Sequence, residues 1–262
     1  MSQSAIHLST RYSDIEWKTR VELAATYRLV HYHGWTSQVY NHITARIPGT
    51  EELLINPFGH AYDEIRPDNL IRIDIAGNKL DGSPHPVNSA GYTIHSALHA
   101  ARPELQCVIH THSQNATAIS CLEEGFIPLT QMGCMFHERI ASHEFEGIAL
   151  DTAERESLIA DFGTSNHTML LSNHGLIVTG PSIAHAFTRL YHFEDCSGVQ
   201  LKAMAAVAGG ATLKRPRPEV VAKTREQFES GEAQAGADSL LPEWPAYLRM
   251  LERMYPGWNE RP

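Results

Sequence analysis

The 262-residue chain has little cysteine, and its four cysteines show no paired spacing. They lie within apolar segments, as reduced and mostly buried thiols do, at Cys107, Cys121, Cys134 and Cys196. This pattern argues against a disulfide framework and against a metal site built from cysteine. The first residues also lack the basic region and the apolar stretch of a secretory signal. Together these absences predict a cytoplasmic protein.

Three further absences each exclude a class of function. No apolar run reaches the length of about 18 residues that a membrane-spanning helix needs. Lys and Arg total 21 against 30 Asp and Glu, and the net charge of −9 argues against nonspecific nucleic-acid binding. No glycine-rich nucleotide-binding loop follows a strand-like segment. The hydrophobic fraction of 42% still supports a substantial core in one large domain, or in one domain with an extension.

What the sequence has in abundance is histidine, and three positions stand out. His110 and His112 lie in the apolar run LQCVIHTHS, which is typical of a strand. Side chains at i and i+2 of a strand leave the same face, so both imidazoles can meet one ion. His174 lies in a Ser-Asn-His-Gly break between two further apolar runs, where site residues often occur. Three neutral imidazoles suit zinc, manganese or iron(II).

A second interpretation stays open, in which His110 and His112 are partnered core residues. With 16 histidines in the chain, roughly one H-x-H triplet is expected by chance. A second triplet, His31-Tyr32-His33, follows a helix-like segment. Residues i and i+2 of a helix do not face each other, so we interpret that triplet as a solvated helix end.

Apolar periodicity and turn residues predict interleaved helices and short strands. Helices are expected over 13–32, 89–101, 114–123 and 152–162, and a long one from Ser182 towards Val207. Strands are expected over 43–48, 52–56 and 70–75, through His110 and His112, and on both sides of His174, whereas 127–149 is irregular or short-stranded. Because several strands are joined by short turns, we expect an α/β fold with a mixed, mainly antiparallel sheet flanked by helices.

The chain is expected to divide into a domain over residues 1–210 and a C-terminal extension over 211–262. The stretch 211–239 is rich in charged residues, proline, glutamine and glycine, with one helical piece near 218–230. The last segment, 241–258, has the pattern of an amphipathic helix with aromatic residues. We expect this helix to dock on its own domain or on a neighbouring subunit.

Four segments, taken in order, resemble the class II aldolase/adducin family. They are YNHITAR at 40–46, LLINPFGHAYDEI at 53–65, AGYTIHSALHAARPELQCVIHTHS at 90–113 and LLSNHGLIVTG at 170–180. The resemblance covers about residues 15–207. It implies a three-layer α/β/α fold and usually a homotetramer with sites at subunit interfaces. It also implies a zinc site whose ligands are His110, His112 and His174.

The chain departs from the sugar-phosphate aldolases of that family at the catalytic acid/base. Those aldolases carry a glutamate four residues before the first histidine of the helix that precedes the H-x-H strand. In this chain that histidine is His95, and the position of the glutamate is occupied by Gly91. Glycine has no side chain and cannot move a proton.

The chain also departs from those aldolases where they bind the substrate phosphate. The equivalents here are Gln38, Tyr40, Asn41, Phe58, Gly59, Ser89 and Ala90. Only Asn41, Gly59 and Ser89 match, and bulky Tyr40 and Phe58 stand where a phosphate would need room. No Lys or Arg replaces the lost hydrogen-bond donors. We therefore expect the three matching residues, together with Tyr40 and Phe58, to line a site for a non-phosphorylated substrate.

Other residues must then transfer protons. His95 and His99 are four apart on one helix and share a face, so His95 is one candidate, with a packed helix histidine as the alternative. Glu138 in the irregular stretch is the other candidate, since loops can reach a pocket. His42 is expected to be buried with a partner, and Glu194 to lie on a solvated helix face.

We therefore expect a metal-dependent lyase, an aldolase or a decarboxylase, that acts on a small non-phosphorylated carbonyl compound or carboxylic acid. Zinc or manganese is preferred to iron, because three histidines without a carboxylate differ from the common iron(II) site. The main alternative is an adducin-like assembly module with a vestigial metal site. A further alternative is an iron-dependent oxidative decarboxylase, an activity that the resemblance also implies for some members of the family.

Overall fold

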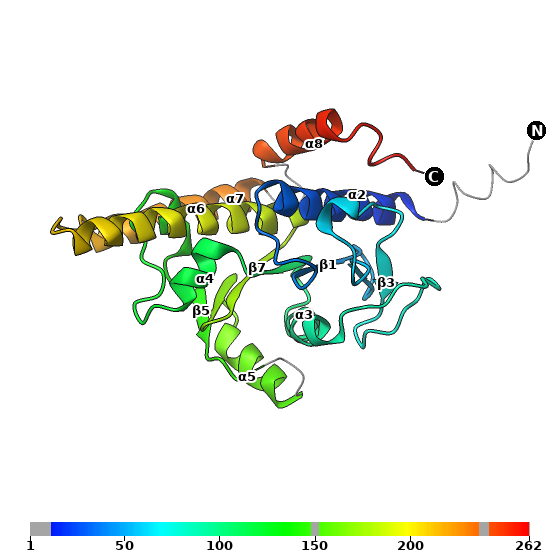
Figure 1. Ribbon diagram of the computed structural model, residues 1–262, viewed down its shortest axis with the longest axis horizontal. Helices are drawn as coiled ribbons and strands as arrows, with labels where there is room; N and C mark the ends of the chain where they lie inside the picture. The colour runs from blue at the N-terminus through cyan, green and yellow to red at the C-terminus, as the bar shows by residue number, and fades with distance from the viewer. Residues whose placement is uncertain (1–11, 148–151, 236–240, 262) are drawn as a thin grey trace, which may run out of the picture.

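The structure is a computed structural model that describes residues 12–147, 152–235 and 241–261. Its strands form one sheet in the order β3-β2-β1-β4-β7-β6-β5 (Figure 1). Neighbouring strands pair antiparallel, except that β5 and β6 are parallel. The bounds are β1 His42–Arg46, β2 Leu53–Ile55, β3 Ile71–Ile73, β4 Cys107–Thr111, β5 Ile140–His143, β6 Thr168–Leu171 and β7 Gly175–Gly180. The expected mixed, mainly antiparallel sheet is confirmed.

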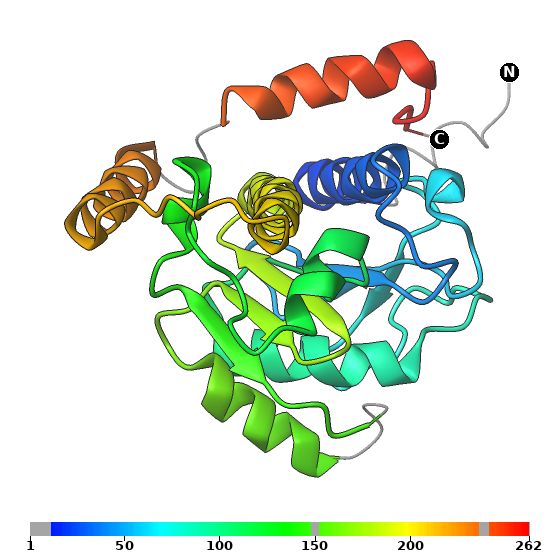
Figure 2. The ribbon, with the colours of Figure 1, turned by 60° about the vertical axis from the view of Figure 1, so that its left-hand side comes forward.

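Helices cover both faces of this sheet and complete three layers (Figure 2). One face carries α2 (Asp14–Tyr32), α4 (Gln114–Ser120) and α6 (Ile183–Ala208), and the other carries α3 (Ser89–Ala101) and α5 (Thr152–Phe162). Side chains along β4 point alternately to the two faces of the sheet and so contribute to both cores. Ile109 packs in the core that contains Phe187 of α6, and Val108 packs in the core that contains Phe162 of α5. Val108 and His110 therefore share the α3/α5 face.

Local signals mark the starts of two helices and the end of one strand. The hydroxyl of Ser13 accepts a hydrogen bond from Glu16 N and caps α2, and Ser182 caps α6 in the same way through His185 N. The strand expected over 70–75 is shorter, since β3 ends at Ile73. The reason is the Asp74 carboxylate, which accepts hydrogen bonds from two backbone N–H groups downstream and turns the chain.

The stretch expected to be irregular contains a short 3-10 helix, η2 (Met132–Phe136), and strand β5. Strand β5 lies at the sheet edge and pairs with β6 so that Ile140 faces Thr168 and His143 faces Leu171. Its two buried positions carry Ala141 and His143, a small and a polar residue, which weakens the apolar pattern that sequence analysis depends on.

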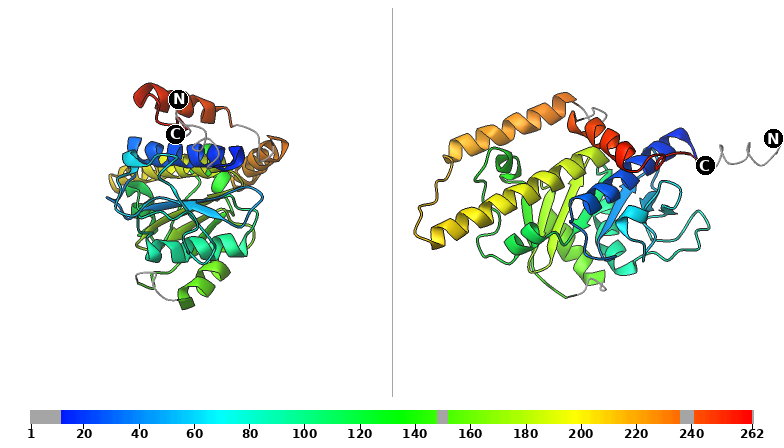
Figure 3. Two further views of the ribbon diagram at one scale, coloured as in Figure 1. Left: turned by 90° about the vertical axis from the view of Figure 1, so that its right-hand side faces the viewer. Right: turned by 45° about the horizontal axis from the view of Figure 1, so that its top comes forward.

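The C-terminal helices pack on the same chain, as the view from above shows (Figure 3). Helix α7 (Pro218–Ala235) lies against η2, and Arg139, which follows η2, places its Nε 2.7 Å from Glu229 Oε1. Helix α8 (Glu243–Met254) packs on α2, burying Trp244 and Leu251. The terminal helix thus docks on its own chain, whereas the division at residue 210 stays a prediction. No described helix is long and apolar enough to cross a membrane.

The triplet at the end of α2 is only partly solvated. His31 and Tyr32 are exposed, but the His33 ring stacks on Trp35 with ring centroids 4.5 Å apart. The expectation of a solvated helix end is therefore wrong for His33. Gly34, with φ of 72°, reverses the chain and brings Trp35 back over the helix end.

Candidate metal centre

The central strand β4 positions two of the three predicted ligands. His110 is paired with His42 of β1 on one side and with Ile177 of β7 on the other. His112 follows the end of β4 and is half-buried. The same side of the strand therefore carries both rings, as the i and i+2 spacing predicts.

The turn between β6 and β7 brings His174 to the same place. Asn173 adopts a φ of 56°, and its N–H donates to the Ser120 carbonyl at 3.1 Å. The next residue but one must be glycine, because a Cβ on Gly175 would lie 2.6 Å from the Thr111 carbonyl oxygen and 3.2 Å from the His112 ring. The glycine of this Asn-His-Gly turn is thus required by the close approach of the turn to β4.

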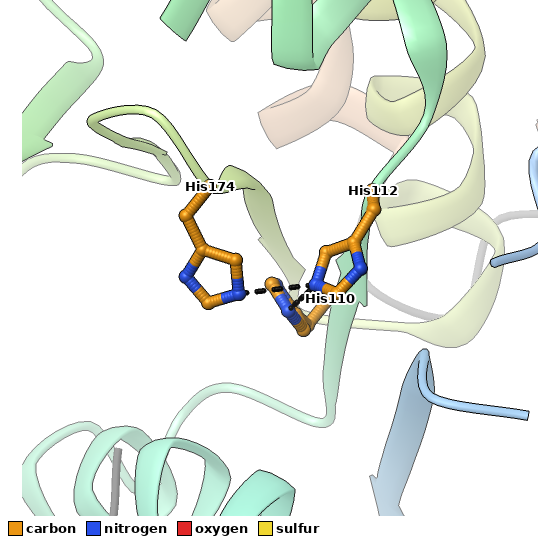
Figure 4. Close-up of side chains that lie close together, drawn as sticks. All are labelled: His110, His112 and His174. Carbon is orange, nitrogen blue, oxygen red and sulfur yellow. Dashed lines mark hydrogen bonds between the residues drawn. The ribbon is translucent and has the colours of Figure 1, made fainter. Parts of the chain in front are cut away.

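Three ring nitrogens converge in what we call the histidine cluster: His110, His112 and His174 (Figure 4). Nε2 of His112 lies 2.9 Å from Nε2 of His110 and 3.0 Å from Nε2 of His174. Nδ1 of His110 lies 3.1 Å from the Leu176 carbonyl oxygen. Because a carbonyl only accepts, Nδ1 carries the proton and Nε2 keeps its lone pair.

Burial keeps these imidazoles uncharged. It lowers the pKa of His110 well below its ordinary value, an effect that His42 and the other cluster histidines reinforce. Burial, followed by the charge of His174, lowers the pKa of His112 to about 4, and burial lowers the pKa of His174 as well. Neutral rings with inward lone pairs are the form that binds a divalent transition metal, so the residues present fit such an ion.

A buried carboxylate fixes the backbone that follows His112. Glu194 is 4% exposed, and its carboxylate accepts hydrogen bonds from Ser113 Oγ at 2.9 Å, Asn115 N at 3.0 Å and Ala116 N at 2.9 Å. The expectation that Glu194 lies on a solvated helix face is therefore wrong. Its partners are the first amides of α4, and the acidic pattern of α6 gives no sign of them.

Asn41, a predicted substrate-binding residue, is buried and bonds to the protein itself. Its Oδ1 accepts from His112 N at 3.2 Å, and its Nδ2 donates to the Trp35 carbonyl at 2.9 Å. The side chain thus joins the start of β1 to the end of β4. Its contact with the site runs through the backbone of His112.

The other predicted lining residues lie around the same end of the sheet. Strand β1 begins and β2 ends there, because Thr44 pairs with Ile55. Tyr40 is 54% exposed, and its ring centroid lies 6.5 Å from that of Phe58. Gly59 follows in a turn with φ of 94°, while the side chain of Ser89 lies outside the described part of the structure.

The two candidates for proton transfer take different positions. Glu138 precedes β5, whereas His174 follows β6, so the parallel pairing of these strands puts them at opposite ends. Glu138 instead lies 3.5 Å from the Arg225 guanidinium, and the described chain does not bring it to the histidine cluster. His95 is fully buried behind His42, whose Nδ1 lies 2.7 Å from His95 Nε2.

The structure adds acidic residues that sequence analysis missed. Glu144 and Glu146, just after β5, line a small cavity together with His143, Phe145 and His174. The ring centroid of Phe145 lies 6.4 Å from that of His174. Only the parallel pairing of β5 with β6 brings this segment to His174, and no local pattern signals it.

Comparison with known proteins shows the family. Residues 21–201 match the Class II Aldolase and Adducin N-terminal domain. The solved structure of an aldolase II superfamily protein from Pseudomonas syringae is 42% identical, covers 97% of this chain and 99% of its own, and has a TM-score of 0.87. L-fuculose 1-phosphate aldolase from Glaciozyma antarctica is 26% identical and covers 95% of each chain, with a TM-score of 0.78.

Adducins are represented among the relatives as well. Alpha-adducin of Rattus norvegicus is 32% identical over 97% of this chain, and the match spans 37% of the adducin. With its ordered motifs, three-layer fold and histidine cluster, this chain belongs to the class II aldolase/adducin family.

Proposed function

We propose that this protein is a metal-dependent lyase that cleaves a carbon–carbon bond in a non-phosphorylated carbonyl compound or carboxylic acid. The observation that carries the proposal is the convergence of three Nε2 atoms on uncharged rings, from His110, His112 and His174. When bound, the divalent ion supplies a Lewis acid that polarises a carbonyl group and stabilises enolate charge. Zinc or manganese suits these ligands, since no carboxylate joins them in the described residues.

For proton transfer we propose Glu144 and Glu146 in place of Glu138. Both carboxylates are exposed and line the cavity that His174 also lines. A carboxylate there can take a proton from a substrate hydroxyl and return it to carbon. Replacing either by Gln should lower turnover, whereas Glu138→Gln should leave it unchanged.

The surroundings of the histidine cluster support a small, non-phosphorylated substrate held at a subunit interface. Tyr40 and Phe58 form an aromatic rim at the sheet end where His112 lies. Helix α8 packs on α2, behind the opposite face of the sheet, so it does not cover the cluster. His112 and His174 are only half-buried, and a homotetramer would supply the missing cover.

Metal binding is the direct test. The purified protein is stripped with a chelator, dialysed against zinc, manganese or iron(II), and its bound metal is measured. We expect one ion per chain in the wild type, loss of the ion in His174→Ala, and no loss in the matched control His31→Ala, whose ring is exposed and remote. A wild type that takes up none of the three metals would disprove the proposal.

An adducin-like assembly module is the second candidate, and the 32% identity to alpha-adducin is the observation that favours it. It predicts oligomers that form equally well in wild type and in the triple variant without His110, His112 and His174. Carbon–carbon cleavage of any hydroxy- or oxo-acid by the metal-loaded wild type, absent in that variant, would decide for the lyase.

A further inference from the structure

Away from the histidine cluster, three guanidinium groups line a single cavity, which we call the arginine cavity. Its volume is about 240 Å³, and its charged and titratable lining residues are Arg102, Arg139, Arg189, His167, Glu104 and Glu229. The cavity lies where β6 begins, next to Thr168, whereas His174 follows the opposite end of β6. A small ligand in the arginine cavity would therefore lie apart from the proposed metal site.

Arg102 is held firmly and still has hydrogen-bond donors to spare. Its Nε donates to the Glu104 carboxylate, and its Nη1 donates to the carbonyls of Gly163 at 3.1 Å and Asn166 at 3.4 Å. The guanidinium also lies over the Phe162 ring, 5.7 Å from its centroid. Within the described part of the chain its Nη2 makes no hydrogen bond, and this atom stays accessible.

Arg139 repeats this arrangement from the other side of the cavity lining. Its Nε donates to Glu229 Oε1 at 2.7 Å, and its Nη1 donates to the Glu138 carbonyl at 2.8 Å. Its Nη2 likewise makes no hydrogen bond to the described residues and is not enclosed. The two side chains are only 17% and 22% exposed, so these spare donors belong to largely buried cations, for which an unfilled N–H group is costly.

The positive groups of the cavity lie deeper than the negative ones. The third guanidinium, that of Arg189, belongs to a residue that is 7% exposed, and its Nη1 donates to the Thr179 carbonyl at 2.8 Å. The carboxylate side chains of Glu104 and Glu229 are 58% and 40% exposed. Ion pairs with such exposed partners contribute little free energy, so a bound anion can compete with them for the guanidiniums.

The spare donors suit a phosphate group better than a carboxylate. Each Nη2 carries two N–H groups, so two separate side chains together offer four. A carboxylate presents two oxygens in one plane to one guanidinium, whereas a phosphate monoester presents three oxygens and about two negative charges. The cavity volume of about 240 Å³ lies below the range of roughly 300–1,000 Å³ for drug-sized ligands, which favours a small phosphate compound over a nucleotide.

We propose that the arginine cavity binds a phosphate group, either free phosphate or that of a small phosphomonoester, through Arg102 and Arg139. This site is separate from the proposed lyase site and does not depend on it. Glu229 belongs to α7 and pairs with Arg139, so the phosphate competes with an ion pair that joins α7 to the rest of the chain.

Binding of two small probes tests the inference. Calorimetry at constant ionic strength gives the Kd of inorganic phosphate and of glycerol 3-phosphate, with glycerol as the uncharged control. The protein is first stripped with a chelator, so that phosphate cannot bind a metal ion at the histidine cluster. We expect the Kd to rise roughly tenfold or more in Arg102→Gln and in Arg139→Gln. It should stay unchanged in Arg66→Gln, which removes an exposed guanidinium outside the cavity lining.

A second variant gives the opposite sign and replaces only a partly exposed side chain. Glu229→Gln removes the carboxylate that competes for Arg139, so the Kd should fall roughly twofold to fivefold. The matched control is Glu226→Gln, which removes the same charge from α7 at an exposed position that pairs with Arg225 and lies outside the cavity lining. This control should leave the Kd unaltered.

The two probes also distinguish the sources of the phosphate group. Tighter binding of glycerol 3-phosphate supports a phosphomonoester, and equal binding supports free phosphate. A wild type that binds neither probe would overturn the inference, as would an equal Kd in wild type and both arginine variants. Metal uptake tests the proposed function separately, so either proposal can fail without the other.

Discussion

The two H-x-H triplets of this chain share their spacing and differ in their surroundings. His110 and His112 lie on and just after a central strand, with Nε2 atoms 2.9 Å apart. His31 and His33 end a helix, where one ring is exposed and the other stacks on Trp35. The spacing brings imidazoles together only where the backbone puts i and i+2 on one face and a distant turn adds a third ring.

The largest expected effect breaks the strand triplet itself. His110→Ala removes the most buried cluster ligand and should weaken zinc binding roughly a hundredfold or more. Competition with a chromophoric chelator measures this affinity. His33→Ala is the matched change in the helix triplet; it should cost about 1 kcal/mol of unfolding free energy through the lost stack on Trp35, with zinc affinity unaltered. Equal zinc affinity in both variants would contradict the comparison.

The next effect tests the turn that supplies the third ring. Gly175→Ala would place a methyl group 2.6 Å from the Thr111 carbonyl oxygen and should lower the free energy of unfolding by about 2 kcal/mol or more. Zinc affinity should fall with it, because the His112 ring must shift. Gly231→Ala is the control, since no atom lies within 4 Å of its new Cβ and α7 gains a better helix former. Denaturant unfolding that showed equal stability for the two variants would exclude this role of the turn.

A smaller effect concerns the backbone after His112. Glu194→Gln keeps the shape of the side chain but sets an NH₂ group against backbone N–H donors, so the unfolding free energy should fall by about 1–3 kcal/mol. Because the start of α4 loosens, zinc affinity should fall by about tenfold. Asp195→Asn, at the exposed neighbouring position, should change neither quantity. If both variants behaved alike, Glu194 would have no part in positioning His112.

The last comparison concerns the pH dependence of the metal-free protein. The folded state holds the pKa of His112 at about 4 against an ordinary 6.5, so the unfolded chain takes up the proton first as pH falls. Stability is therefore complete above about 6.5 and is lost progressively as pH drops towards about 4. His110 and His174 act in the same direction. The midpoint of urea unfolding is measured at several pH values. It should fall less steeply with decreasing pH in His112→Asn than in wild type or in the control His31→Ala. Equal slopes would refute the contribution of His112 to the pH dependence of stability.

Much of the site could be predicted because its signals are local. An apolar run with histidines two apart, and an Asn-His-Gly break before a second apolar run, are patterns within a few residues. The capping serines at 13 and 182 likewise mark the starts of α2 and α6 in their own neighbourhoods. The short strand β5 was harder to predict, since its buried positions carry alanine and histidine, which give no apolar alternation in the sequence.

The rest depended on pairings that no local pattern carries. His42 could be connected to the site only through its register with His110, and Glu144 only through the parallel pairing of β5 with β6. Glu194 lies in a part of α6 whose composition is that of a solvated helix face. Its partners are nevertheless backbone amides that lie 79 and 78 residues earlier in the chain. The position of Glu138, at the end of β5 that is far from His174, follows from the same strand direction.

The sequence by itself determined which residues could bind a metal and which backbone would put two of them on one face. Those properties depend on side-chain chemistry and on backbone geometry over a few residues. Tertiary structure alone decided that a turn more than 60 residues away completes the cluster, that close approach of this turn to β4 requires Gly175, and that His42 lies beside the buried His95. Such neighbours follow from sheet order and helix packing, which bring distant segments together through contacts that neither segment specifies alone.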